Sequence, residues 1–123
     1  VAPRHVTRED FFDGLFVALK ADPATSTLVA VPDAYVPVLT LAYDGVDIDL
    51  LFARLALSVI PPTLDLLDDV HLRNIDEKSV LSLNGVRVTD SILRLVPSID
   101  TFRTSLRCIK HWAKVRAERA SEE

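Results

Sequence analysis

Residues 43–52 read Tyr-Asp-Gly-Val-Asp-Ile-Asp-Leu-Leu-Phe, and this stretch decides how the chain folds. Its Asp-Gly pair lies between two apolar runs, 36–43 and 46–55. Such a pair is typical of the tight turn of a β-hairpin, because both residues tolerate a positive φ. We therefore expect two strands, at 36–43 and about 46–52, joined by this turn. A short strand, or the approach to one, is expected before them at 28–31.

The second hairpin strand carries two carboxylates on one face. Val46, Ile48 and Leu50 alternate with Asp47 and Asp49, so the acidic side chains share the face opposite the apolar ones. Paired carboxylates on a strand suit a divalent metal that activates a phosphate. The alternative is the polar outer face of a half-exposed hairpin. The alternation alone leaves both interpretations open.

Helical signals flank the hairpin on both sides. Four helices are expected, at 7–20 with Thr7 as N-cap, at 76–83 ending at Asn84-Gly85, at 90–96 with Thr89 as N-cap, and at about 100–117. Residues 53–60 are rich in alanine and leucine and could also turn helical, whereas 1–6 reads as a linker and 64–69 as a short helix or turn. Pro61-Pro62 marks a boundary between a β-containing part, 1–60, and a helical part, 61–123.

The last expected helix has an apolar stripe beside a cationic one. The apolar positions are Phe102, Leu106, Ile109 and Ala113, and the cationic positions, one residue along, are Arg103, Arg107, Lys110 and Lys114. Four cations on one side of a helix can bind phosphates. The alternative is a solvated helix face paired with local acidic residues.

Composition narrows the classes of protein. The 123 residues make one domain or a piece of one, and a net charge of −4 means that any RNA contact must come from local clustering of cations. Three glycines exclude the glycine-rich phosphate loops. No apolar run approaches the roughly 18 residues of a membrane span. The chain contains no methionine, which suggests a segment of a longer protein.

Several stretches together resemble nuclear, eukaryotic-type poly(A) polymerases. They are residues 1–6, 44–57, 82–90, 93–97, 102–103 and 106–114, in order and without large gaps. The resemblance implies a polymerase-beta-like nucleotidyltransferase palm followed by a helical middle domain and an RNA-binding domain. It also implies template-independent addition of adenylates from ATP to RNA 3′ ends, with two Mg²⁺ or Mn²⁺ ions held by three strand carboxylates.

The resemblance assigns roles to individual residues. Asp49 matches the third metal-binding, catalytic carboxylate, whereas Asp47 matches a position that is acidic in relatives but is not one of the three. Asn84 and Lys110 match positions that contact ATP, and Lys110 would pair with the phosphates. Lys114, one turn further on, would assist in binding ATP.

The chain also departs from the family pattern. The family's Gly-Ser motif and Asp-x-Asp strand come immediately before the segment that begins here at Val1, and neither is present. After Lys114, residues 115–123 replace a basic run and a tyrosine-containing stretch. With one of three carboxylates, this chain alone is expected to be inactive. Arg103 and Arg107 are the candidate contacts to RNA or phosphate.

We therefore expect an α+β fold: a partial palm of hairpin and helix at 1–60, then a helical middle-domain segment at 61–123. The chain is interpreted as part of a poly(A) polymerase whose chemistry is completed outside it. The alternative is a catalytically dead derived domain that acts as a structural or RNA-contacting module in a larger assembly. Expected partners are ATP, an RNA 3′ end, and a protein or remaining chain that completes the sheet. The expected location is the nucleus, with no membrane contact.

Overall fold

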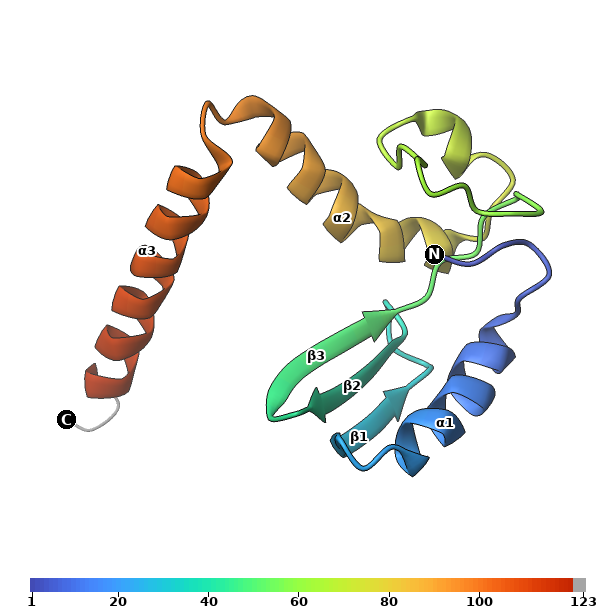
Figure 1. Ribbon diagram of the computed structural model, residues 1–123, viewed down its shortest axis with the longest axis horizontal. Coiled ribbons are helices and arrows are strands. Elements are labelled where there is room, and N and C mark those ends of the chain that lie inside the picture. Colours follow the sequence, from blue (N-terminus) through green and yellow to red (C-terminus); the bar gives the residue numbers. More distant parts are fainter. Residues whose placement is uncertain (121–123) are drawn as a thin grey trace. The chain divides into compact units, whose positions relative to one another are not determined.

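The computed structural model describes residues 1–120, and these fold into a three-stranded antiparallel sheet with helices (Figure 1). The elements in chain order are the π-helix η1 Asp10–Leu15, α1 Phe16–Ala21, β1 Thr25–Val31, β2 Val38–Tyr43, β3 Val46–Leu51, the 3₁₀ helix η2 Asp69–Leu72, α2 Glu77–Leu95 and α3 Ile99–Ala120. The predicted α+β class is confirmed. Packing divides the chain into two compact units, Val1–Val88 and Thr89 onward.

The predicted hairpin is confirmed, and it belongs to a sheet with the order β1-β2-β3. Asp44 and Gly45 take the left-handed backbone conformations, φ 48° and 76°, that a two-residue turn between antiparallel strands requires. Tyr43 therefore pairs with Val46, and Thr40 pairs with Asp49. The strand expected at 28–31 is also present, but it begins three residues earlier, at Thr25.

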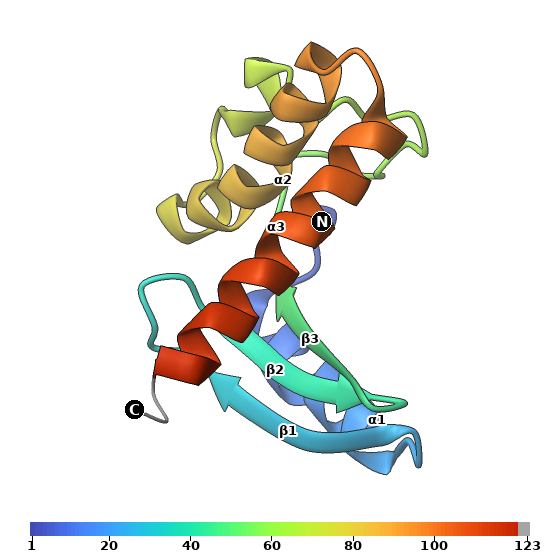
Figure 2. The same cartoon turned by 90° about the vertical axis from the view of Figure 1, so that its left-hand side faces the viewer.

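One face of the sheet is covered by the first helical segment, η1 followed by α1 (Figures 1 and 2). The Phe11 ring on η1 lies with its centroid 5.4 Å from that of Phe52, at the end of β3. Leu39 and Leu41 of β2 are buried, and the partner of Leu39 across the ladder is Leu50. Because side chains alternate along a strand, the residues between these face away from η1 and α1.

Residues 53–57 are extended, so the helix expected at 53–60 is wrong. Ala2 donates to the carbonyl of Ala53 at 2.8 Å, Leu55 donates to Ala2 at 2.9 Å, and Arg4 donates to Leu57 at 2.8 Å. Residues 1–6, expected to be a linker, thus include a short parallel pairing with the chain that follows β3. Backbone pairing with a distant segment overrides the local preference of alanine and leucine for helix.

A second apolar cluster lies between this extended segment and the start of α2. Ala53, Leu55 and Leu83 are buried at its centre. Partly buried side chains pack around them from the irregular region that contains η2, namely Leu57, Ile60, Leu64, Leu66, Leu72 and Ile75. The region read as a short helix or turn at 64–69 therefore supplies side chains to this cluster.

The helix α2 is continuous, which corrects two predictions. Residues Glu77–Leu95 form one helix, so Asn84-Gly85 does not end it and Thr89 does not begin a new one. A glycine inside a helix costs only about 1 kcal/mol relative to alanine. The first half of α2 buries Ser79, Ser82 and Leu83 in the first unit, and this packing keeps the helix continuous through Asn84-Gly85.

The second unit contains the last turns of α2 and the helix α3. α3 begins one residue before the expected start at Asp100 and reaches Ala120. The tail predicted at 121–123 lies outside the described residues. None of the helices formed within 1–120 has the length and apolar character that crossing a membrane demands.

Candidate functional site

The candidate site begins with the acidic face of β3. Asp47 and Asp49 are both exposed, whereas Ile48 and Leu50 between and beyond them are partly buried. The predicted alternation is therefore present, and the carboxylates face away from η1 and α1. An exposed carboxylate keeps its hydration and needs no buried counter-charge, so this face is stable as it stands.

Asp49 differs from Asp47 in what lies across the ladder. The hydroxyl of Thr40 on β2 donates a hydrogen bond to Oδ1 of Asp49 at 2.9 Å. The residue opposite Asp47 is Ala42, whose methyl side chain has no hydrogen to donate. The sheet thus holds one carboxylate by a cross-strand hydrogen bond and leaves the other to solvent.

The oxygens of Asp49 and Asp47 are the ligand type that Mg²⁺ and Mn²⁺ prefer. Within residues 1–120 the structure brings together no group of three histidine, cysteine, aspartate or glutamate side chains that could hold a metal ion. The donor chemistry at Asp49 fits a divalent cation, but the described residues provide only part of a complete site.

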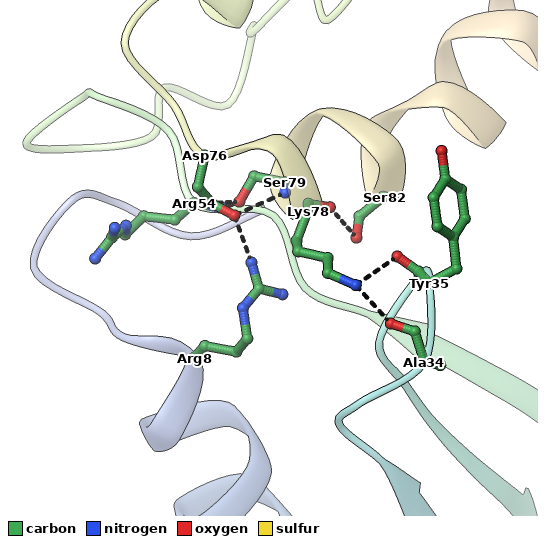
Figure 3. A network of polar contacts seen from close by, with 8 residues as sticks. All are labelled: Arg8, Ala34, Tyr35, Arg54, Asp76, Lys78, Ser79 and Ser82. Carbon is green, nitrogen blue, oxygen red and sulfur yellow. Dashed lines mark hydrogen bonds and ion pairs between the residues drawn. The ribbon is translucent and has the colours of Figure 1, made fainter.

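The end of β3 is fixed by a polar network at the start of α2 (Figure 3). Asp76 accepts hydrogen bonds from the backbone N–H of Ser79 at 3.0 Å, from its hydroxyl at 2.7 Å, and from Nη2 of Arg8 at 2.7 Å. The hydroxyl of Ser79 in turn accepts from the backbone N–H of Arg54 at 3.0 Å. Asp76 thereby caps α2 and connects it to Arg8, which precedes η1, and through Ser79 to Arg54, which follows β3.

The charge state of Asp76 follows from these contacts. Burial works to raise the pKa of this carboxyl, but the hydrogen bonds from Ser79 and the positive charge of Arg8 outweigh burial and hold the pKa below its ordinary value. The guanidinium of Arg8 also lies 5.4 Å from the centroid of the Phe52 ring. Figure 3 shows the Arg54 guanidinium directed away from this network.

A second polar contact fixes the loop between β1 and β2. The ammonium of Lys78 donates to the carbonyl of Ala34 at 2.7 Å and to that of Tyr35 at 3.0 Å (Figure 3). Lys78 also lies 5.8 Å from the centroid of the Tyr35 ring, which is 73% exposed. The first turn of α2 therefore holds both the strand exit and the loop that precedes β2.

The other predicted site residues lie on helices. Asn84 is exposed in the middle of α2, within the first unit, and is not the helix end that the sequence indicated. The four cations of the predicted stripe are exposed on α3, in the second unit, and they are Arg103, Arg107, Lys110 and Lys114. Lys114 lies 3.9 Å from Glu118, one turn along, which is the local pairing that the solvated-face alternative describes.

Sequence reasoning missed Thr40 and the network around Asp76. Thr40 could have been found, because a two-residue turn at 44–45 sets the register and places residue 40 opposite residue 49. The contacts of Asp76 with Arg8 and of Ser79 with Arg54 join positions 68 and 25 residues apart. No pattern of neighbouring residues in the sequence predicts contacts over such separations.

The fold is α+β, and residues 1–96 match the family described as "Poly(A) polymerase nucleotidyltransferase domain", so the class is that of nucleotidyltransferases. The chain belongs to the poly(A) polymerase family. The resemblance stated from the sequence is therefore confirmed. The chain is 56% identical over 114 residues to "Poly(A) polymerase" of Dictyostelium discoideum, covering 92% of this chain and 14% of that protein.

Two further relatives agree. "Nuclear poly(A) polymerase 1" of Arabidopsis thaliana is 56% identical over 117 residues, which is 94% of this chain and 16% of that protein. "Poly(A) polymerase PAPalpha" of Candida albicans is 50% identical over 117 residues, which is 95% of this chain and 21% of that protein. The chain thus spans between about a seventh and a fifth of the length of these relatives.

Proposed function

We propose that this chain contributes to a template-independent poly(A) polymerase, which transfers AMP from ATP to an RNA 3′ end and releases pyrophosphate. The observation that carries the proposal is the exposed carboxylate of Asp49 on the open face of a sheet in a poly(A) polymerase nucleotidyltransferase domain. The activity is that of the whole polymerase, and this segment supplies one part of its site. Neither the structure nor the comparisons favour a catalytically dead module.

Asp49 is the metal-binding carboxylate in this proposal. When bound, Mg²⁺ or Mn²⁺ would activate the 3′-hydroxyl and neutralise charge on the triphosphate. Asp49 presents hard oxygen ligands on a regular strand, where the ladder fixes the backbone, and strands position ligands more accurately than loops do. Asp47 shares the face but stays outside the metal-binding set.

The geometry of β3 supports completion of the site by chain outside these residues. β3 is an edge strand of the sheet, and Ala2 pairs in parallel with Arg54 just beyond it. Asp49 precedes Arg54 by five residues (54 − 49). A strand that enters Ala2 in the same register would therefore run beside β3 and pass Asp49 five residues before Ala2. Carboxylates on such a strand would lie next to Asp49.

The helices supply the nucleotide contacts. Asn84 and Lys110 contact ATP, with Lys110 on the phosphates and Lys114 assisting, and Arg103 and Arg107 contact RNA or phosphate. All five side chains are exposed, so none is occupied in a buried core. Lys110→Ala is expected to raise KM for ATP more than KM for RNA, and Arg103→Ala to do the reverse.

Two further statements belong to the proposal. By the resemblance, residues 1–60 would form part of the palm and residues 61–123 would begin the middle domain, although the compact unit Val1–Val88 and the family match over residues 1–96 both cross the boundary at Pro61-Pro62. The protein acts in the nucleus, which the name of the Arabidopsis relative, "Nuclear poly(A) polymerase 1", supports.

The test uses the protein expressed from its complete native coding sequence. It is incubated with ATP, Mg²⁺ or Mn²⁺ and an oligoadenylate primer, and primer extension is followed by gel electrophoresis. We expect extension without a template, and we expect Asp49→Ala to abolish it. Asp13→Ala, which removes another exposed carboxylate, is the matched control and should leave extension unchanged. Absence of extension by the native protein would refute the proposed activity, and full extension by Asp49→Ala would refute the role of Asp49.

A further inference from the structure

We propose that Thr40 is a positioning residue, whose hydroxyl orients the carboxylate of Asp49 for metal binding. The inference rests on the proposed function, because it concerns the residue that the proposal assigns to the metal. It is drawn from one contact, in which the hydroxyl of Thr40 donates to Oδ1 of Asp49 at 2.9 Å.

The two residues are joined by the register of the sheet. Thr40 lies on the central strand β2 and is the direct ladder partner of Asp49 on β3. Directly opposed residues of antiparallel strands project on the same face with their Cβ atoms about 4.5–5.5 Å apart. The hydroxyl is therefore brought to Asp49 by the backbone pairing itself.

The chemistry of the pair is suited to orienting a ligand. The terminal torsion of an aspartate is broad, so an exposed aspartate on a strand samples many carboxylate orientations. Threonine is β-branched and restricted at χ1, so the position of its hydroxyl oxygen is confined. A bond from this donor to Oδ1 restrains the carboxylate plane and leaves the lone pairs of Oδ2 for a cation.

The comparison with Asp47 shows that the contact is selective. Asp47 stands on the same face of the same strand, but its ladder partner Ala42 has no donor. If this polar face served only as a solvated surface, its two neighbouring carboxylates would not need to differ in cross-strand hydrogen bonding. Metal-ligating carboxylates, in contrast, are themselves hydrogen-bonded, and loss of such a partner costs about 10–100-fold in metal affinity or activity.

The test compares three threonine variants of the native full-length protein. Thr40→Val removes the hydroxyl and keeps the branched shape, whereas Thr40→Ser keeps a hydroxyl. Thr25→Val is the matched control on β1, since Thr25 Oγ1 is buried without a hydrogen-bond partner among the described residues. Mn²⁺ binding is measured by loss of the free-ion EPR signal, with and without ATP and in the absence of RNA. Asp49→Ala defines the part of the binding that depends on Asp49.

We expect Thr40→Val to weaken Asp49-dependent Mn²⁺ binding by about 10–100-fold and to raise the Mg²⁺ concentration for half-maximal adenylate transfer by a similar factor. Thr40→Ser should retain most of the affinity, and Thr25→Val should bind as the native protein does. Circular dichroism confirms that each variant is folded. A Thr40→Val protein that is folded and binds Mn²⁺ normally would overturn the inference.

The two proposals fail in different ways. If native protein transfers adenylate, Asp49→Ala is inactive, and Thr40→Val matches the native protein in both metal readouts, only the role of Thr40 is wrong. If the native protein neither transfers adenylate nor binds Mn²⁺ through Asp49, the proposed function is wrong and the role of Thr40 falls with it. Equal losses in Thr40→Val and Thr40→Ser would also overturn the inference, because the hydroxyl would then not be the active feature.

Discussion

Replacing Asp76 with alanine should loosen the exit of β3 and the start of α2 together. The carboxylate caps α2 through the backbone N–H of Ser79 and pairs with Arg8 at 2.7 Å. It also holds the Ser79 hydroxyl, which accepts from the backbone N–H of Arg54. Asp76→Ala removes the acceptor of the Ser79 N–H, the Ser79 hydroxyl and the Arg8 guanidinium at once, and the Ser79 hydroxyl that accepts from Arg54 loses its restraint. We therefore expect local opening at two places in the sequence, near Arg54 and at the first turn of α2.

The size of the effect can be estimated from the contacts. Loss of an N-cap costs about 1 kcal/mol. Hydrogen bonds to charged groups are worth about 1.5–3 kcal/mol, and the lower value applies because the side chains of Arg8 and Asp76 are 24% and 37% exposed. The total is about 2.5 kcal/mol, and at about 1.4 kcal/mol per factor of ten this corresponds to roughly 60-fold faster exchange from opened states.

The assay is amide hydrogen exchange with mass spectrometry on the complete native protein. Peptides that contain Arg54 and residues 77–83 are the reporters, and a peptide from β2 is the internal reference. Asp76→Asn is the matched control, since its amide oxygen still caps the helix while the charge facing Arg8 is lost. We expect it to keep the cap and to lose only the contribution of the charge, about 1.5 of the 2.5 kcal/mol.

Exchange in Asp76→Ala that stays within about threefold of the native rate at both reporters would refute this reasoning. A change confined to residues 77–83 would show that Asp76 caps the helix but does not stabilise the strand exit. A loss of equal size in Asp76→Asn would assign the whole effect to the charge rather than to the cap.

Four further predictions follow from single contacts. The pKa of Asp76 is lowered in the folded state, so its carboxylate stabilises the fold fully above the unfolded pKa of about 3.9, and this stabilisation is lost as pH falls through the folded pKa. The hydrogen-exchange rates of native protein and Asp76→Asn should therefore converge only at acidic pH. Gly45→Ala should destabilise the hairpin by about 1–2 kcal/mol. The added methyl meets no atom within 4 Å, so the cost comes from the left-handed φ of 76° alone, and unchanged exchange in β2 and β3 would contradict this. Thr25→Val should stabilise the protein by about 1 kcal/mol by removing an unpaired buried hydroxyl, and a lower melting temperature would oppose that view. The isolated 123-residue chain should associate through the open edge of β3, whereas a monomer in light scattering with one cooperative unfolding transition would exclude this.

The parts of the fold that could be predicted from the sequence are those decided by neighbours in the chain. The turn at Asp44-Gly45 and the alternation along β3 depend on residues a few positions apart, and both are present. The predicted bounds of the amphipathic helix α3 lie within three residues of the observed ones at each end for the same reason. Local chemistry was sufficient because no distant segment competes with it at these places.

The wrong predictions fall where distant segments decide. Residues 53–57 are extended because residues 2–4 pair with them, and α2 continues through Gly85 because Ser79, Ser82 and Leu83 are buried. In both cases tertiary contacts outweigh a local preference of about 1 kcal/mol or less per residue. The candidate site shows the same division, since alternation placed Asp49 on the face opposite Ile48 and Leu50, whereas the network of Asp76 did not follow from any pattern.

The place of Asp49 follows from two demands on one strand. Ile48 and Leu50 turn toward the helical face, since burial of apolar surface stabilises the unit, and the pleat then directs the residues between them to water. A hydrated carboxylate is stable there without a partner, so folding alone requires neither a metal nor a donor at this position. The hydrogen bond from Thr40 is therefore the feature of this face that folding leaves unexplained. In the proposal this bond orients a metal-binding carboxylate, and Thr40→Val should therefore change metal binding more than stability.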